Sequence, residues 1–222
     1  GFSPYFSYSE SFEPQVGFDP LTNGETPSPS LGDQFEAGLR WQSPDGDFSA
    51  TASLFRIDQT NIVNADLDNP GFSVLVGEQR HDGFEVEFIG RPVDALQLQA
   101  GYTYLDAEIT SSNNGDQGDV PLNVPEHAAA FFATLDGTAF GVPGADVSAG
   151  VRHVGERRAN NIGDELPDFT LVDFGAGYTF DRYRVQLNVK NAFDERYFTA
   201  GDVRAAIDGE GRVVQATLRA SF

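Results

Sequence analysis

A chain of 222 residues without cysteine excludes disulfide frameworks, thiol catalysis and thiolate metal sites. Its formal net charge of −20 argues against nucleic acid as a partner, because the phosphates would be repelled. No apolar run approaches the roughly 20 residues that a membrane-spanning helix needs, and the 19 Phe, 7 Tyr and 24 Gly favour strands and turns.

The chain alternates apolar and polar side chains from its first residues onward, which is typical of strands with two different faces. Phe2, Phe6 and Tyr8 alternate with Ser3 and Ser7, for example. In chain order, the pattern predicts strands over residues 2–9, 34–41, 48–61, 72–91, 96–104, 129–135, 147–152, 172–180, 184–190 and 212–222. The last of these has a wholly apolar face, ends in an aromatic residue and carries Gln, Thr and Arg on its other face.

The connections between these strands mostly alternate between long and short. Long polar stretches occupy residues 13–32, 64–71, 111–124 and 160–167 and the approach to the closing strand, whereas tight turns occupy 44–47, 92–95 and 181–183. The turn over 138–146 is an exception, since it is longer than the other turns. Long loops on one side and tight turns on the other are typical of an outer-membrane barrel.

Charged side chains decide between a barrel and a soluble sandwich. The strand charges fall on the face opposite the apolar one: Glu36, Arg40, Glu85, Glu87, Asp173, Arg184 and Lys190. Burying them in a dry core would cost several kcal/mol each, and a hydrated lumen removes that cost. The sequence therefore predicts an all-β fold, a transmembrane antiparallel barrel. Aromatic residues near the strand ends fit interfacial girdles: Trp41, Tyr102, Tyr104, Tyr178, Phe180 and Phe222.

Several segments together resemble a known family. They are residues 5–14 (YFSYSESFEP), 34–39, 77–80 with 83–87, 102–108, 124–127, 150–155, 188–197 (NVKNAFDERY) and the final Phe222. In this order they resemble segments of TonB-dependent siderophore receptors, especially the ferrichrome type. The resemblance implies that residues 1–222 are a partial barrel domain, about the last ten strands of a 22-stranded outer-membrane barrel.

The same resemblance implies that the plug domain, its TonB-binding coupling box and the first dozen or so strands are absent. An open ten-stranded sheet would leave two unpaired edges, which lipid does not tolerate. Gly1 is also not followed by a signal peptide. We therefore expect a piece of a longer or processed protein, a truncated reading frame or half of a split barrel.

The implied function is uptake of ferric siderophores across the outer membrane of a Gram-negative bacterium, driven by TonB and the proton-motive force. No covalent chemistry and no cofactor are expected, and the ferric siderophore is the cargo. Loop or rim aromatics are the candidate ligand contacts, namely Phe18, Phe72 and Phe198. The family's final loop often carries Cys and aromatics, which residues 199–211 lack.

The closing strand has a separate implied role. In the family, the barrel-assembly machinery recognises the terminal aromatic strand, here carrying Val214, Leu218 and Phe222, and outer-membrane lipid surrounds the barrel. Two other classes stay open: a passive porin or small structural barrel without energy coupling, and a soluble sandwich that binds carbohydrate.

Enzymatic and metal sites are weaker alternatives. Adjacent residues on a strand point to opposite faces, so His81 and Asp82 do not form a catalytic pair, and we predict no enzyme. His127 and His153 are isolated and fit structural roles. Two groups could offer loop oxygens to Ca²⁺ without the spacing of an EF-hand: Asp66, Asp68 and Asn69, and Asp202, Asp208 and Glu210. Solvated loop acids are the favoured interpretation, and no metal is predicted.

Overall fold

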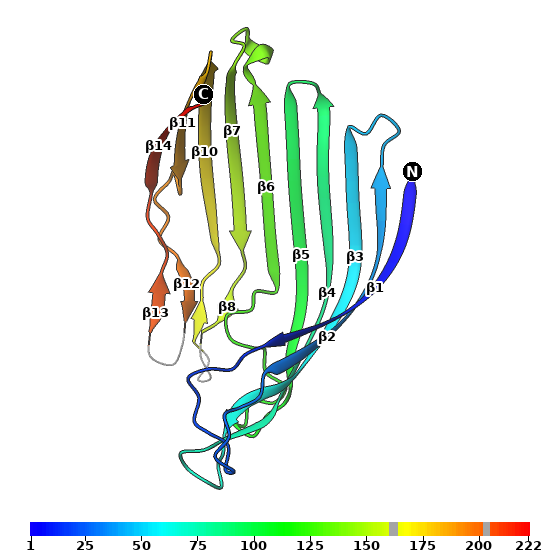
Figure 1. Ribbon diagram of the computed structural model, residues 1–222, viewed down its shortest axis with the longest axis vertical. Coiled ribbons are helices and arrows are strands. Elements are labelled where there is room, and N and C mark those ends of the chain that lie inside the picture. The colour runs from blue at the N-terminus through cyan, green and yellow to red at the C-terminus, as the bar shows by residue number, and fades with distance from the viewer. Residues whose placement is uncertain (160–163, 202–204) are drawn as a thin grey trace.

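One antiparallel sheet dominates the computed structural model, which describes residues 1–159, 164–201 and 205–222 (Figure 1). Its strand order in the described residues is β1-β2-β3-β4-β5-β6-β7-β10-β11-β14. Each strand therefore pairs with the next long strand along the chain, which is the up-and-down order of a barrel wall.

The ten strands of the sheet match the ten predicted ones. They are β1 (Phe2–Glu13), β2 (Ser30–Gln42), β3 (Phe48–Ala65), β4 (Ser73–Val93), β5 (Leu96–Ser111), β6 (His127–Asp136), β7 (Ala145–Val154), β10 (Phe169–Phe180), β11 (Tyr183–Lys190) and β14 (Val213–Ala220). The closing strand is shorter than predicted, because it ends at Ala220 and leaves Phe222 outside.

Two connections contain small sheets that the sequence pattern did not predict. One pairs β8 (Arg157–Arg158) with β9 (Glu165–Leu166), and the other pairs β12 (Phe198–Gly201) with β13 (Ala206–Asp208). The long turn predicted over 138–146 overlaps the 3-10 helix η1 (Gly137–Phe140). Among the described residues, no helix is long and apolar enough to cross a membrane.

The two ends of the sheet differ as predicted. In Figure 1 the tight turns lie at the top and the long connections at the bottom. The β2–β3 turn is closed by Ser43, whose Oγ accepts the Phe48 N–H at 3.0 Å, and by Gly46, whose φ of +81° suits glycine. We call the two ends of the sheet the turn end and the loop end.

Strand register joins the apolar residues of all ten strands into one face. Phe6 lies opposite Ala37, Ala37 opposite Leu54 and Leu54 opposite Phe84. At the far edge, Val185 of β11 lies opposite Leu218 of β14. This apolar face stays open, since Phe6 and Leu218 are each 69% exposed. The described residues do not place a second sheet over it, so the sandwich alternative is wrong.

The opposite face, which we call the polar face, carries the predicted charges. Glu36 and Arg40 of β2 lie opposite Ser7 and Ser3 of β1. Glu85 of β4 lies opposite Ser53. The prediction that the strand charges share one face is therefore confirmed for these positions.

The apolar face is not free of charge along its whole length. Toward the loop end, Arg56 pairs with Asp82 at 2.6 Å and Arg80 with Asp58 at 2.7 Å. β3 and β4 are 18 and 21 residues long, whereas about 9–11 residues cross a bilayer. The expectation of an almost uncharged wall is thus wrong at this end, because the strands continue beyond the apolar band.

The polar face is also partly apolar toward the loop end. Long connections fold over it there and bury a small core, whose members are Ala107, Ile109, Ala159, Leu166, Phe169 and Leu171. The described chain therefore buries its side chains mainly where loops meet the sheet, and it leaves the middle of both faces open.

Candidate functional site

The described parts of five long connections meet at the loop end of the sheet and form what we call the loop layer, residues 14–29, 66–72, 112–126, 155–159, 164–168, 191–201 and 205–212. The first connection is fixed by Gln15. Its Nε2 donates to the carbonyl of Asn61 at 2.7 Å, and its Oε1 accepts the Val63 N–H at 2.9 Å. The Ser73 N–H donates to the Pro20 carbonyl at 2.9 Å, which ties the same connection to β4.

Asparagines join the end of β3 to the third connection. Asn64 is 8% exposed and donates through Nδ2 to Ser112 Oγ at 3.0 Å and Asn113 Oδ1 at 2.9 Å. Asn113 donates back to the Ala65 carbonyl at 2.8 Å. The first three connections are therefore linked through the ends of β3 and β4.

Asn123 joins the third connection to the fourth and the fifth. Its side chain accepts the Gly201 N–H at 2.7 Å and donates to the Gly201 carbonyl at 2.9 Å, as in a pair of sheet residues. Its own N–H donates to the Arg158 carbonyl at 2.8 Å. The φ of Asn123 is +63°, a left-handed conformation that asparagine tolerates better than most residues.

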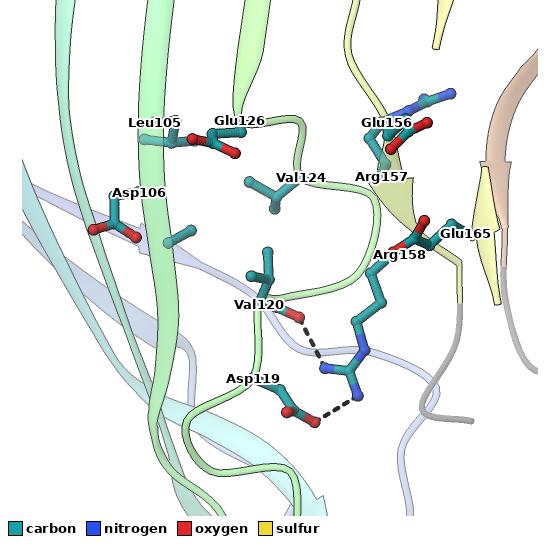
Figure 2. Close-up of a pocket in the computed structure, with 11 residues that line it drawn as sticks. Leu105, Asp106, Asp119, Val120, Val124, Glu126, Glu156, Arg157, Arg158 and Glu165 are labelled. Carbon is teal, nitrogen blue, oxygen red and sulfur yellow. Dashed lines mark hydrogen bonds and ion pairs between the residues drawn. The ribbon is translucent and has the colours of Figure 1, made fainter. Parts of the chain in front are cut away.

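Two consecutive arginines strengthen this junction. Arg157 is 6% exposed and donates to the carbonyls of Phe198 at 2.7 Å and Thr199 at 3.0 Å. Burial lowers the pKa of its guanidinium from the usual value. Arg158 points the other way, donating to Asp119 at 2.6 Å and to the Val120 carbonyl at 2.9 Å (Figure 2).

A cavity of about 580 Å³ lies between these segments and β5. Apolar side chains line part of it, namely Leu105, Ala107, Val120 and Val124. Carboxylates of Asp119, Glu126, Glu156 and Glu165 lie around it together with the two arginines (Figure 2). Such a mixture of apolar and charged groups suits an amphipathic ligand.

Two further hollows lie on the polar face. One of about 550 Å³ is lined by groups that include Phe55, Ile57 and His81. The other, of about 320 Å³, lies nearer the turn end and is lined by Tyr5, Glu36, Arg40, Thr51, Ser53, Glu85 and Glu87. The second hollow is strongly polar, as expected of a wall that faces water.

The structure brings two of the three predicted ligand contacts into neighbouring segments. Phe18 lies in the first connection and is 54% exposed, and Phe72 lies just before β4 and is 36% exposed. The Ser73–Pro20 hydrogen bond holds these segments together. Phe198 lies elsewhere, in β12, where its carbonyl accepts from Arg157. Among the described residues that line the two larger cavities, these three aromatics do not occur, and their role stays a prediction.

Two residues of the predicted assembly signal, Val214 and Leu218, lie on the apolar face. Val214 and Leu218 are 63% and 69% exposed, and Phe222 follows the end of β14. The Arg182 guanidinium carbon lies 5.6 Å from the centre of the Phe222 ring. Recognition by the assembly machinery stays a prediction.

The histidines occupy structural positions. Asp82 bonds Arg56 on the apolar face, whereas His81 lines a hollow on the polar face, so the two do not form a pair. His127 Nδ1 lies 2.8 Å from the Tyr102 hydroxyl. His153 Nδ1 lies 3.0 Å from Thr170 Oγ1.

Of the predicted loop acids, Asp66 serves as a turn acceptor, whereas Asp208 lies in β13. Asp66 accepts the N–H groups of Asp68 and Asn69 and the Asn69 side chain, at 3.0–3.1 Å. Asp202 lies outside the described residues. Within the described ranges, we find no group of three or more His, Cys, Asp or Glu residues arranged to hold a metal.

Sequence reasoning missed Asn123, Arg157 and Arg158, which make the main contacts between the later connections. The adjacent arginines were a usable signal, because the chain has only 14 Lys and Arg residues against 34 acids. Their partners are mostly backbone carbonyls, which no side-chain pattern indicates.

Comparisons with known proteins agree with this architecture. A family model described as "TonB dependent receptor-like, beta-barrel" matches residues 1–192. The chain is 36% identical to the metal-pseudopaline receptor CntO of Pseudomonas aeruginosa over 86% of its length and 27% of that protein. It is 35% identical to the ferrichrome outer membrane transporter/phage receptor of Escherichia coli, over 89% of this chain and 27% of that one.

The crystal structure of the siderophore receptor PiuA from Acinetobacter baumannii superposes with a TM-score of 0.79 at 28% identity. The match covers 98% of this chain and 34% of that one. The chain thus spans about a quarter to a third of the length of the proteins it matches.

Proposed function

This chain belongs to the TonB-dependent receptor-like β-barrel family, and from that membership we propose that residues 1–222 form the closing ten strands of an outer-membrane receptor barrel. The observation that carries the proposal is the apolar face, which continues through all ten strands of the described sheet opposite a charged polar face. A sheet of this kind fits a barrel that contacts lipid on its outer face and a water-filled lumen, here called the bore, on its inner face.

We propose that the complete receptor imports ferric siderophores. The support is the ferrichrome transporter and the siderophore receptor among its relatives, together with an open cavity of about 580 Å³ between the loop layer and β5. Phe18, Phe72 and Phe198 are the proposed aromatic contacts of the chelate in that layer.

The proposed mechanism has two stages and no covalent step. The loop layer first binds the chelate from outside. A plug domain, connected to TonB, then moves and lets the chelate pass along the polar face, using energy from the inner membrane. The barrel-assembly machinery and outer-membrane lipid are the other proposed partners, through Val214, Leu218 and Phe222 and through the apolar face.

Uptake in a deletion strain tests this proposal. The strain receives the complete receptor gene and is grown under iron limitation with ferrichrome, ferrioxamine B or no chelator. A metal–pseudopaline complex extends the series, since the CntO receptor is named for a metal complex of that compound. We expect uptake of at least one chelate that is lost when TonB is deleted.

The porin alternative predicts another result. A passive barrel would admit small chelates with or without TonB, in proportion to their size. Failure of every chelate to enter in the presence of TonB would contradict the proposed import.

A further inference from the structure

Three aromatic rings on the polar face lie directly opposite glycines of the neighbouring strand. Tyr5 of β1 is opposite Gly38 of β2, Phe55 of β3 is opposite Gly83 of β4, and Phe132 of β6 is opposite Gly150 of β7. The polar face is the one that the proposed function assigns to the bore. Rings that stood away from the wall would therefore narrow the passage.

The glycines leave the space into which the rings fold. A Cβ atom on Gly38 would lie 2.5 Å from Cε1 and Cζ of Tyr5. A Cβ atom on Gly83 would lie 2.5 Å from Cζ of Phe55, and one on Gly150 would lie 3.1 Å from Cδ2 of Phe132. Real Cβ atoms essentially never approach another atom to 2.5 Å and seldom to 3.1 Å, so the rings occupy volume that a side chain at these positions would need.

The surroundings of Tyr5 show how completely a ring is held against the wall. Its hydroxyl donates to Glu36, and the Arg40 guanidinium carbon lies 4.5 Å from the ring centre on the same strand as Gly38. Three residues of β2 thus hold the Tyr5 ring of the neighbouring strand: Gly38, Arg40 and Glu36. The hollow of about 320 Å³ beside it stays open.

We propose that Gly38, Gly83 and Gly150 are clearance positions, which keep the aromatic rings of the inner wall flat and so determine how large a cargo the bore admits. The inference rests on the proposed import function. It assigns to the glycines an effect on passage, separate from binding in the loop layer, because all three lie in the strands of the sheet.

Gly101 supplies a matched control. It belongs to β5 and lies opposite Glu87, on the same polar face, but a Cβ there would meet no atom within 4 Å. Gly101→Val therefore adds the same side chain to the same wall without displacing a ring. Gly83 is a poorer site for substitution, because its Cβ would also lie 2.5 Å from the Tyr104 carbonyl oxygen.

The test compares Gly38→Val, Gly101→Val, Tyr5→Ala and the double variant Tyr5→Ala/Gly38→Val in the complete receptor. The position of the Tyr5 ring is determined by crystallography or electron cryomicroscopy, and binding and uptake of the transported chelate are measured separately. In Gly38→Val we expect the ring to project into the bore, binding to be unchanged and uptake to fall about tenfold. Gly101→Val, Tyr5→Ala and the double variant should keep wild-type uptake.

A ring that stays flat in Gly38→Val overturns the inference whether or not the receptor imports siderophores. Displacement of the ring with unchanged uptake also overturns it, as does an equal loss of uptake in Gly101→Val. Absence of uptake by the wild type would instead contradict the proposed function. If Gly38→Val does not assemble, Gly150→Val provides the second variant, with Phe132 as the ring to be followed.

Discussion

A buried arginine joins two of the long connections at the loop end. Arg157 supplies N–H donors to the carbonyls of Phe198 and Thr199 from a position that is only 6% exposed. Its guanidinium carbon also lies 5.3 Å from the centre of the Phe169 ring. Charged donors to buried carbonyls are worth more than neutral ones, so this side chain fixes the connection that carries Phe198.

Arg157→Ala should loosen that connection. Two carbonyls lose their donors, at a cost of about 1.5–3 kcal/mol. We therefore expect hydrogen exchange of the amides in 198–201 to accelerate by at least about tenfold, with little change in the strands of the sheet. Arg182→Ala, at the turn end, is the control. Unchanged exchange in 198–201 would show that other contacts hold the connection.

The Asp66 turn predicts a pH dependence. Hydrogen bonds from the Asn69 side chain and from the Asp68 and Asn69 N–H groups lower the pKa of the Asp66 carboxyl from its ordinary value of 3.8. Because the pKa in the folded turn is the lower one, the stabilisation is present above the unfolded pKa and is lost as the pH falls through the folded value.

Proteolysis of 66–72 by an acid protease measures this effect. We expect cleavage to increase as the pH is lowered below about 4, the ordinary carboxyl pKa. Asp66→Asn keeps an acceptor oxygen but does not titrate, so its cleavage should not show the same increase. A wild-type profile identical to that of Asp66→Asn would contradict the assignment.

At the scale of a strand, alternation gives β3 two different environments. Ala52 lies on the apolar face opposite Leu39 and Val86, whereas Thr51 lies on the polar face opposite Arg40 and Glu87. An arginine on the lipid side near the bilayer midplane costs about 2–4 kcal/mol. An arginine at Thr51 would instead lie in a hydrated hollow between the Arg40 guanidinium and the Glu87 carboxylate, where the attraction to the acid offsets the like charge and water screens both.

We therefore expect Ala52→Arg to destabilise the receptor and Thr51→Arg to be tolerated. The two substitutions are compared by urea unfolding in detergent or lipid and by the heat-modifiable band on gels. Equal losses for both variants would contradict the assignment of the two faces.

The same scale explains what the sequence could predict. Strands such as β10 and β11 were found because side chains alternate with a period of two over many residues, and the two faces followed from that period. The alternation does not show how far a residue lies from the middle of the membrane. Arg56 and Asp82 occupy apolar-face positions of their strands, and both are charged. Alternation therefore predicts the face on which a side chain lies, but not its position along the membrane normal.

The small strands had no signal of this kind. β8 and β9 are two residues long, and their position depends on contacts such as that of Arg158 with Asp119. β12 is held by Asn123 and Arg157 from other connections. Contacts between distant segments leave no periodic pattern in the sequence. The sequence therefore predicted where the long connections lie in the chain, but not the small strands and hydrogen bonds within them.

At the scale of the whole molecule, the described sheet has two edges. β1 pairs with β2 and β14 pairs with β11, and the described residues provide no further neighbour for either edge strand. Unpaired N–H and C=O groups cost several kcal/mol each in lipid. The proposed barrel satisfies them with strands from outside residues 1–222.

Hydrogen exchange on β1 tests this requirement. In the complete receptor, we expect the β1 amides that point away from β2 to be protected as well as those that pair with it. In the 222-residue chain alone, the outward-pointing amides should exchange rapidly. Protection of both sets in the isolated chain would mean that the sheet closes on itself or pairs with a second copy.

The central claim is that one face of every strand contacts lipid while the other contacts water. The chain contains no cysteine, so single cysteines can be introduced along β3 from residue 49 to 54 and spin-labelled in the complete receptor in lipid vesicles. Collision rates with oxygen, which partitions into lipid, and with a water-soluble nickel chelate then report the environment of each position. The account predicts oxygen contact at Ala50, Ala52 and Leu54 and nickel contact at Ser49 and Thr51; equal or reversed accessibilities would contradict it.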